Sequence, residues 1–242
     1  MIEFIIIFTV LFFIAVLFYK QANENFEILQ VEASRISELP TMYSERTPIV
    51  VSNFQPPNLG TESELLKRHT ILSMYVTKGA TLRQLLSSRT LKTFVFPKAT
   101  AEFLAKETGL SVWFSNSLFP SLLPSPYTSW FYTHKTSLWP DHRGMFKTTA
   151  FQTILMPTQG NATVVLMLGS VVPYLPLRWE TKSFHSLTAD DTPLLNQIKY
   201  IEIKVRKGTL LSLPAHMIVD ISGDPSVWTF IGEIHHPISL MA

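Results

Sequence analysis

The sequence contains no cysteine, which excludes disulfide bonds, thiolate metal sites and a cysteine nucleophile. It also has no block of positive charge, because its 20 Lys and Arg residues are spread along the chain and are balanced by 18 Asp and Glu residues. Proteins that bind nucleic acid usually gather Lys and Arg on one face. Nucleic acid is therefore not expected as a partner. The absence of cysteine does not identify the cellular compartment of the protein.

Several active-site motifs are missing as well. The sequence has no Gly-x-Ser-x-Gly turn, no Gly-Lys-Ser/Thr phosphate loop, no His-Glu-x-x-His pair and no dinucleotide-binding glycine pattern. Asp190 and Asp191 form an adjacent acidic pair, but neighbouring residues of a strand point apart, and such pairs are more typical of solvated turns. No catalytic, cofactor-binding or metal-binding residue is predicted.

One long apolar run is present, at the N-terminus, where residues 4 to 18 read FIIIFTVLFFIAVLF between Glu3 and Lys20. About 20 apolar residues cross the hydrocarbon core of a bilayer. The run, extended by Ile2 and Tyr19, thus predicts a transmembrane anchor over residues 1 to 20 that contacts the lipid bilayer through residues 2 to 19. The predicted localisation is a membrane, with a single-pass N-terminal anchor of undetermined sidedness.

Two alternatives exist for this run, a cleaved signal peptide and a buried core segment. The signal peptide is disfavoured because the run has no basic start, and because Lys20-Gln21-Ala22 is a poor cleavage site.

After the anchor, residues 21 to 45 are polar and acidic and are expected to form a stalk, and residues 46 to 242 are expected to form the folded domain. Short helices are predicted after Thr61, over residues 81 to 88, and over residues 100 to 108 before Gly109. Asn161 begins a glycosylation sequon, but Gln159-Gly160-Asn161 is better explained as a hairpin turn. Short β-branched or aromatic runs between turn residues predict strands at 47–51, 69–76, 91–96, 150–156, 162–168, 200–205, 210–213, 217–221 and 227–234.

The stretch from Lys207 to Val219 carries a family resemblance. Gly208, five further residues and Pro214 precede an apolar strand, and Val219 is the fifth residue after the proline. Together with the runs at 39–54, 163–168 and 200–205, in this order, the stretch resembles the Jumonji-type cupin-like family. The resemblance implies a mainly β domain with a few helices, a double-stranded β-helix or jelly roll, here behind the predicted transmembrane helix.

Members of this family that oxidise substrates bind iron through a His-x-Asp pair and a distal His, and the resemblance implies where these ligands would lie in this sequence. The distal His position falls on Val219, and a count without gaps from Gly160 places the pair on Lys147 and Thr149. The lysine that would pair with 2-oxoglutarate falls on Ala162. None of these side chains is a suitable replacement, because valine has no lone pair and a protonated lysine cannot bind a metal.

The histidines provide the alternatives. His134, Asp141 and His142 lie upstream of the expected pair and form a candidate set of displaced ligands, but without the His-x-Asp spacing. His216 is expected on the opposite strand face from Val219. The remaining histidines are interpreted as isolated or surface residues: His69, His185, His235 and His236.

These observations favour a membrane-anchored, catalytically inactive cupin-like protein with a structural or interaction role and with protein partners. A membrane-bound assembly, such as the capsid of a large virus, is one setting that fits. The alternative is an Fe(II)/2-oxoglutarate-dependent oxygenase that uses His134, Asp141 or His142 with His216. A third class, a carbohydrate- or lipid-binding domain, requires an apolar or aromatic-lined cavity in place of the iron site.

Overall fold

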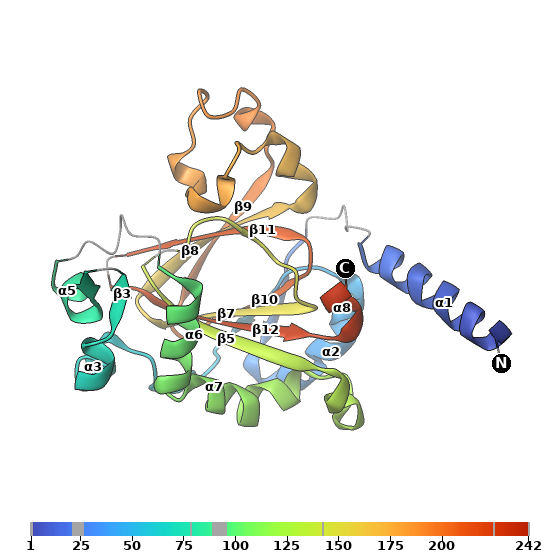
Figure 1. Ribbon diagram of the computed structural model, residues 1–242, viewed down its shortest axis with the longest axis horizontal. Helices are drawn as coiled ribbons and strands as arrows, with labels where there is room; N and C mark the ends of the chain where they lie inside the picture. The colour runs from blue at the N-terminus through green and yellow to red at the C-terminus, as the bar shows by residue number, and fades with distance from the viewer. Residues whose placement is uncertain are drawn as a thin grey trace.

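Two facing sheets form the body of the molecule in the computed structural model, which describes residues 2–20, 27–77, 79–88, 96–141, 143–224 and 226–241 (Figure 1). The large sheet has the strand order β1-β2-β10-β7-β12-β5, and the small sheet has the order β6-β11-β8-β9. The strands are β1 (Leu29–Glu32), β2 (Ile49–Ser52), β3 (Tyr75–Thr77), β4 (Ala80–Thr81), β5 (Thr133–Pro140), β6 (Phe146–Lys147), β7 (Gln152–Gln159), β8 (Asn161–Leu168), β9 (Tyr200–Arg206), β10 (Leu210–Pro214), β11 (Met217–Gly223) and β12 (Trp228–His235).

Short helices and helical turns surround these sheets. The helices are α1 (Ile2–Lys20), α2 (Leu39–Met42), α3 (Glu62–Leu65), α4 (His69–Leu72), α5 (Leu82–Ser88), α6 (Lys98–Glu107), α7 (Leu110–Trp113) and α8 (Pro237–Met241). The helical turns are η1 (Ala33–Glu38), η2 (Tyr43–Glu45), η4 (Phe114–Leu118), η5 (Phe119–Leu122), η6 (Pro126–Phe131), η7 (Gly169–Tyr174), η8 (Trp179–Thr181), η9 (Phe184–Ser186) and η10 (Leu195–Gln197).

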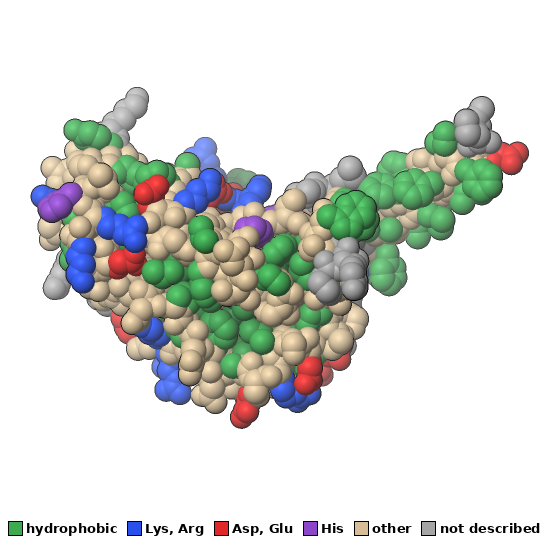
Figure 2. Space-filling model, turned by 90° about the horizontal axis from the view of Figure 1, so that it is seen from below, with side chains coloured by type: hydrophobic (Ala, Val, Ile, Leu, Met, Phe, Trp, Pro, Cys, Tyr) green, Lys and Arg blue, Asp and Glu red, His purple; other side chains and the backbone are tan. Residues whose placement is uncertain are grey.

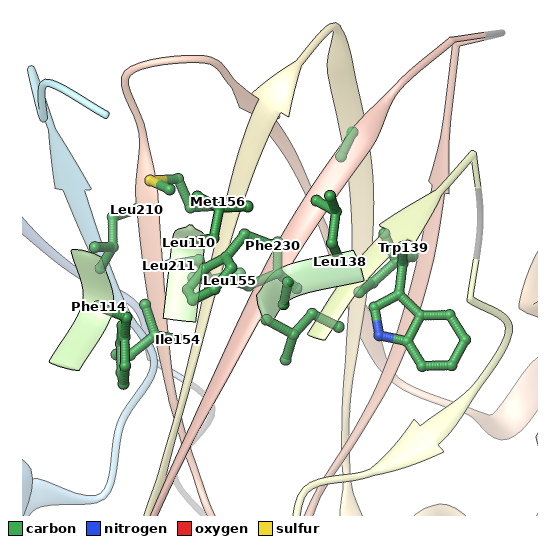
Figure 3. Packing of buried hydrophobic residues seen from close by; sticks show 14 of the residues in the cluster. Leu110, Phe114, Leu138, Trp139, Ile154, Leu155, Met156, Leu210, Leu211 and Phe230 are labelled. Carbon is green, nitrogen blue, oxygen red and sulfur yellow. The ribbon is translucent and has the colours of Figure 1, made fainter. Parts of the chain in front are cut away.

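The large sheet is buried on both faces. A Cβ atom added to Gly232 in β12 would meet the Phe114 ring at 2.8 Å, so the even-numbered residues of β12 face the helices. Figure 3 shows Leu110 and Phe114, from α7 and η4, close to strand residues such as Ile154. The odd-numbered residues of β12 face the small sheet, because side chains alternate along a strand.

The small sheet is also covered on both faces. Val219 and its neighbour Leu166 face the large sheet and belong to the main core, whereas Ile218 and Val165 belong to a second cluster under residues 169 to 198. Asp220, fully buried on this second face, accepts hydrogen bonds from Ser183 Oγ at 2.7 Å and from the backbone N–H of Phe184 at 2.8 Å. The segment between β8 and β9 is thus attached to the sheet by apolar and polar contacts.

Many predicted elements are confirmed. The six runs from residue 150 onward form β7 to β12, the run at 47–51 forms β2, and the helices at 81–88 and 100–108 correspond to α5 and α6. Thr61 caps α3 by accepting a hydrogen bond from the N–H of Glu64. Gly160, with φ of 74°, makes the predicted turn between β7 and β8. The strand predicted at 69–76 is wrong in its first half, which forms α4. Most of the strand predicted at 91–96 lies outside the described residues.

The predicted fold class is wrong. The protein is not mainly β with a few helices but mixed, with 41% of its residues helical, 30% in strands, and more than one sheet. The difference comes from segments for which the sequence patterns predicted neither a helix nor a strand. Residues 110 to 131 and 169 to 197 instead form successive short helices and helical turns.

The predicted transmembrane anchor and single-pass membrane localisation are wrong as well. Within residues 2–20 and the other described ranges, no helix is sufficiently long and apolar to cross a membrane. The helix α1 does form at the predicted place and contacts α8, and it carries hydrophobic side chains along the face shown in Figure 2.

Residues 27 to 45 of the predicted stalk contribute to the body of the molecule, and residues 21 to 26 lie outside the described residues. β1 pairs in parallel with β2, which joins it to the large sheet. Leu39 and Tyr43, from the helical turns that follow, are buried in the main core. These few buried positions could not be predicted, because the segment is polar overall.

Candidate functional site

The position that the resemblance assigns to the distal metal ligand lies inside the body of the protein. Val219 is 0% exposed in the middle of β11, with Phe146 of β6 beside it on one side and Leu166 of β8 on the other. All three side chains belong to the main core between the sheets. Their immediate contacts are therefore hydrocarbon, which offers a metal ion no electron pair.

The residues expected to replace the His-x-Asp pair lie elsewhere. Lys147 and Thr149 are both exposed, and Lys147 is opposite Ile218, whose side chain faces away from the main core. The count without gaps therefore selected the wrong strand face. The side chains on the same face as Val219 are one residue earlier in each case, Phe146 and Thr148.

Thr148 is buried, and its hydroxyl is used within the fold. It donates a hydrogen bond to the carbonyl oxygen of Pro214 at 2.7 Å and accepts one from the N–H of Met217 at 2.9 Å. The backbone of Thr148 makes two further bonds to the same turn, accepting from the N–H of His216 and donating to the carbonyl of Met217. Thr148 thus fixes β6 to the turn between β10 and β11.

A cation, the side chain of Arg143, lies next to the side chains around Val219. The guanidinium of Arg143 is 3.6 Å from the centre of the Phe146 ring and 4.8 Å from that of the Trp139 ring, distances at which a cation is attracted to an aromatic face. Burial lowers the pKa of Arg143 to about 10, and the charge of Glu233 opposes this effect. The guanidinium is still protonated at neutral pH, so a half-buried positive charge lies at this end of the core.

Glu233 provides the matching negative charge. It lies on the face of β12 that is directed at the small sheet, with Lys98 Nζ and His235 Nε2 each 3.8 Å from its carboxylate. Burial alone would raise the pKa of Glu233, but His235, Lys98 and Arg143 outweigh it and hold the pKa below its usual value. The result is a group of ionisable side chains that runs from the exposed Lys98 to the buried His235, which we call the Glu233 cluster: Lys98, Arg143, Glu233 and His235.

No protein-family model matches the sequence, and no curated protein is significantly similar to it. The geometry of the site therefore carries the functional argument alone.

The predicted displaced ligands do not come together. His134 faces the helices, with its ring 5.6 Å from that of Phe114 and 4.8 Å from that of Phe119, and burial lowers its pKa. Asp141, at φ of 51°, accepts a hydrogen bond from the N–H of Ser226. His216 lies in the turn between β10 and β11, and His142 lies outside the described residues. Among the residues that are described, no three His, Asp or Glu side chains are grouped as metal ligands.

The other histidines contact neighbouring side chains of the fold and are not grouped with one another as ligands. His69 is hydrogen-bonded to Arg83 at 3.0 Å, and His185 is 3.8 Å from Glu202. The interpretation of His235 as a surface residue is wrong, because it is only 6% exposed. His236 is half-buried, and its ring lies 4.9 Å from that of Phe151.

The acidic pair forms a turn, as the sequence indicates. Asp190 is exposed, while Asp191 accepts hydrogen bonds from the backbone N–H and the hydroxyl of Thr188 and pairs with Lys182. Ala162 is buried in β8 within the main core.

The sequence patterns did not predict the Glu233 cluster. One signal was present, since Glu233 and His235 alternate with apolar residues at the end of a strand that is otherwise hydrophobic. An acidic residue at such a position is rarely buried without a partner. The partners Lys98 and Arg143 come from distant segments, and their proximity depends on the fold.

Proposed function

We propose that this protein is a non-catalytic relative of the Jumonji-type cupin-like proteins and works as a binding or structural module. The observation that carries this proposal is the set of groups around Val219. Phe146 and Leu166 flank it, and Arg143 lies over Phe146. A hydrophobic centre under a guanidinium cannot supply the electron pairs that a divalent cation needs.

The strand arrangement supports the relationship. From β5 to β12 the chain passes repeatedly between the two sheets, so that β5, β7, β10 and β12 lie in the large sheet and β6, β8, β9 and β11 in the small one. The positions that the resemblance assigns to metal ligands lie in or directly after β6 and in β11. The chain presents Phe146, Thr148 and Val219 there.

The side chains at this position do not fit an Fe(II) site. Iron in such proteins is held by imidazole and carboxylate groups. Thr148 offers only a neutral hydroxyl, which is already bonded to the turn, and the nearby positive charge of Arg143 would repel a dication. The nearby carboxylate, Glu233, is already balanced by the charges of Lys98 and Arg143.

The proposal is tested by adding Fe(II) and 2-oxoglutarate, without oxygen, to the full chain and measuring its thermal unfolding. A ligand that binds only the folded state raises the melting temperature. We expect no shift with either addition and no succinate when oxygen is admitted. A shift that requires both additions, or release of succinate, would support the oxygenase alternative instead.

A further inference from the structure

A cleft of about 910 Å³ lies between the two sheets, at the end where the large sheet finishes in β1 and the small sheet in β9. It is separate from Val219 and the Glu233 cluster, none of which lines it. Its walls come from β1 and β2 on one side and from β8 and β9 on the other.

The apolar part of the cleft has the spacing of a strand. Ile201, Ile203 and Val205 alternate along β9 and face the interior, opposite Val50 of β2. Ile201 and Ile203 are half-buried, whereas the intervening side chains of β9 are exposed on the other face. The cleft therefore offers apolar contacts at every second residue of β9.

The backbone of β9 is also available. Among the described residues, β9 pairs only with β8, so every second residue directs its N–H and C=O away from the sheet. All residues from 201 to 206 line the cleft, although neighbouring side chains point to opposite faces. The edge of the strand itself is thus presented at the mouth of the cleft, and open strand edges readily accept another strand.

We propose that the cleft binds an extended peptide segment of a partner protein, which adds to the small sheet as a strand next to β9. Main-chain hydrogen bonds to the edge would provide affinity, and alternate apolar side chains would enter the cleft beside Ile201 and Ile203. A helix or a compact small molecule could not satisfy a row of alternating backbone groups. This inference rests on the proposed function, because it names the partner of a binding module.

The charges of β9 specify the peptide further. The side chains of Lys204 and Arg206 lie on the exposed face of β9, opposite to that of Ile203 and Val205, and neither forms an ion pair within the described part of the chain. Glu202, on the same face, lies near His185. Opposite charges stabilise cross-strand pairs. The preferred peptide therefore alternates apolar residues with acidic ones.

The experiment is a selection from a display library of random peptides of roughly eight residues, which is within the usual range of strand lengths. The full chain is the target, and the enriched peptides are then synthesised and their dissociation constants measured. We expect enrichment of sequences in which Val, Ile or Leu alternate with Asp or Glu. No enrichment of such a pattern would overturn the proposal.

Two variants localise the binding. Ile203→Lys puts a charge into the cleft and is expected to weaken binding about tenfold to a hundredfold, the loss expected when one apolar anchor is removed. Thr133→Lys adds the same charge at an exposed position of the edge strand β5, away from the cleft, and should bind like the unmodified chain. Circular dichroism establishes that both variants are folded. Equal affinity for all three proteins would contradict the assigned site.

Backbone pairing is tested on the peptide. N-methyl groups on alternate amides should abolish binding in one of the two possible phases and be tolerated in the other, because only one set of amides faces β9. Tolerance in both phases would exclude strand addition. If the full chain instead forms a dimer that Ile203→Lys separates, the occupant is a second copy, and the peptide proposal is wrong. A failure of either kind leaves the metal tests of the proposed function unaffected.

Discussion

At the scale of single residues, what a position can bind depends on which face of a strand its side chain occupies. Phe146 and Lys147 are adjacent in β6, yet one is buried in the main core and the other is exposed. A shift of one residue in an alignment exchanges the two faces. The sequence alone indicates that Val219 is buried and cannot bind a metal. Its neighbours, by contrast, are known only from the register of the strands.

Replacing Thr148 with Val tests whether this residue is structural. The change removes the hydroxyl that bonds to Pro214 and Met217 while keeping the shape of the side chain. We expect the free energy of unfolding to fall by about 1 to 3 kcal/mol, because buried backbone groups lose their partner. Urea denaturation measures the loss, and Thr148→Ser, which keeps the hydroxyl, should recover most of it. Equal stability of Thr148→Val and the unmodified protein would exclude this role.

The Glu233 cluster predicts how stability depends on pH. The pKa of Glu233 in the folded protein is below its usual value of 4.5, so the ionised carboxylate stabilises the fold. This contribution is complete above the unfolded pKa and is lost as the pH falls through the folded one.

Glu233→Gln should therefore reduce the free energy of unfolding at neutral pH, and the difference from the unmodified protein should shrink as the pH falls below about 4.5. Urea denaturation at several pH values measures this difference. Glu107→Gln, at an exposed position in α6, makes the same change in net charge and serves as the control. A difference that grows on acidification would show that the carboxylate is destabilising where it lies.

At the scale of elements, the strands were more predictable than the helices. β7 to β12 have β-branched or apolar runs bounded by glycine and proline, and these local signals agree with the fold. The turns η4 and η5 and the segment from η7 to η10 lack a regular 3.6-residue apolar pattern, since each contributes only a few buried side chains, such as Phe114 and Phe184. Their helical form depends on packing against a sheet, which local sequence does not specify.

Asp220 is expected to stabilise one such element, the segment between β8 and β9. Asp220→Ala removes the acceptor of the Ser183 and Phe184 hydrogen bonds, and the segment between β8 and β9 should become less protected. We expect hydrogen exchange to accelerate over residues 169 to 197, together with a loss of about 2 to 3 kcal/mol in the free energy of unfolding.

Asp190→Ala, an exposed position in the same segment, is the matched control. Unchanged exchange in Asp220→Ala would mean that the apolar cluster under the segment holds it without this carboxylate.

At the scale of the whole molecule, the two sheets bury one continuous core, and the proposed loss of metal chemistry follows from how that core is filled. Apolar groups surround Val219, and the charges at the same end are grouped as the Glu233 cluster rather than around a common point. The sequence alone indicated missing ligands. It did not show the cation over Phe146 or the cleft beside β9, because both arise from segments far apart in the chain.

The most direct test of this account is the metal content of the full chain, purified from cells supplied with iron, manganese and zinc and measured by mass spectrometry of the elements. Tight metal sites retain their ion through purification when imidazole and carboxylate ligands are in place. We predict far less than one equivalent of any of these metals per chain. Close to one equivalent, kept through dialysis and lost on replacement of His134 or His235 by Ala, would contradict the central claim.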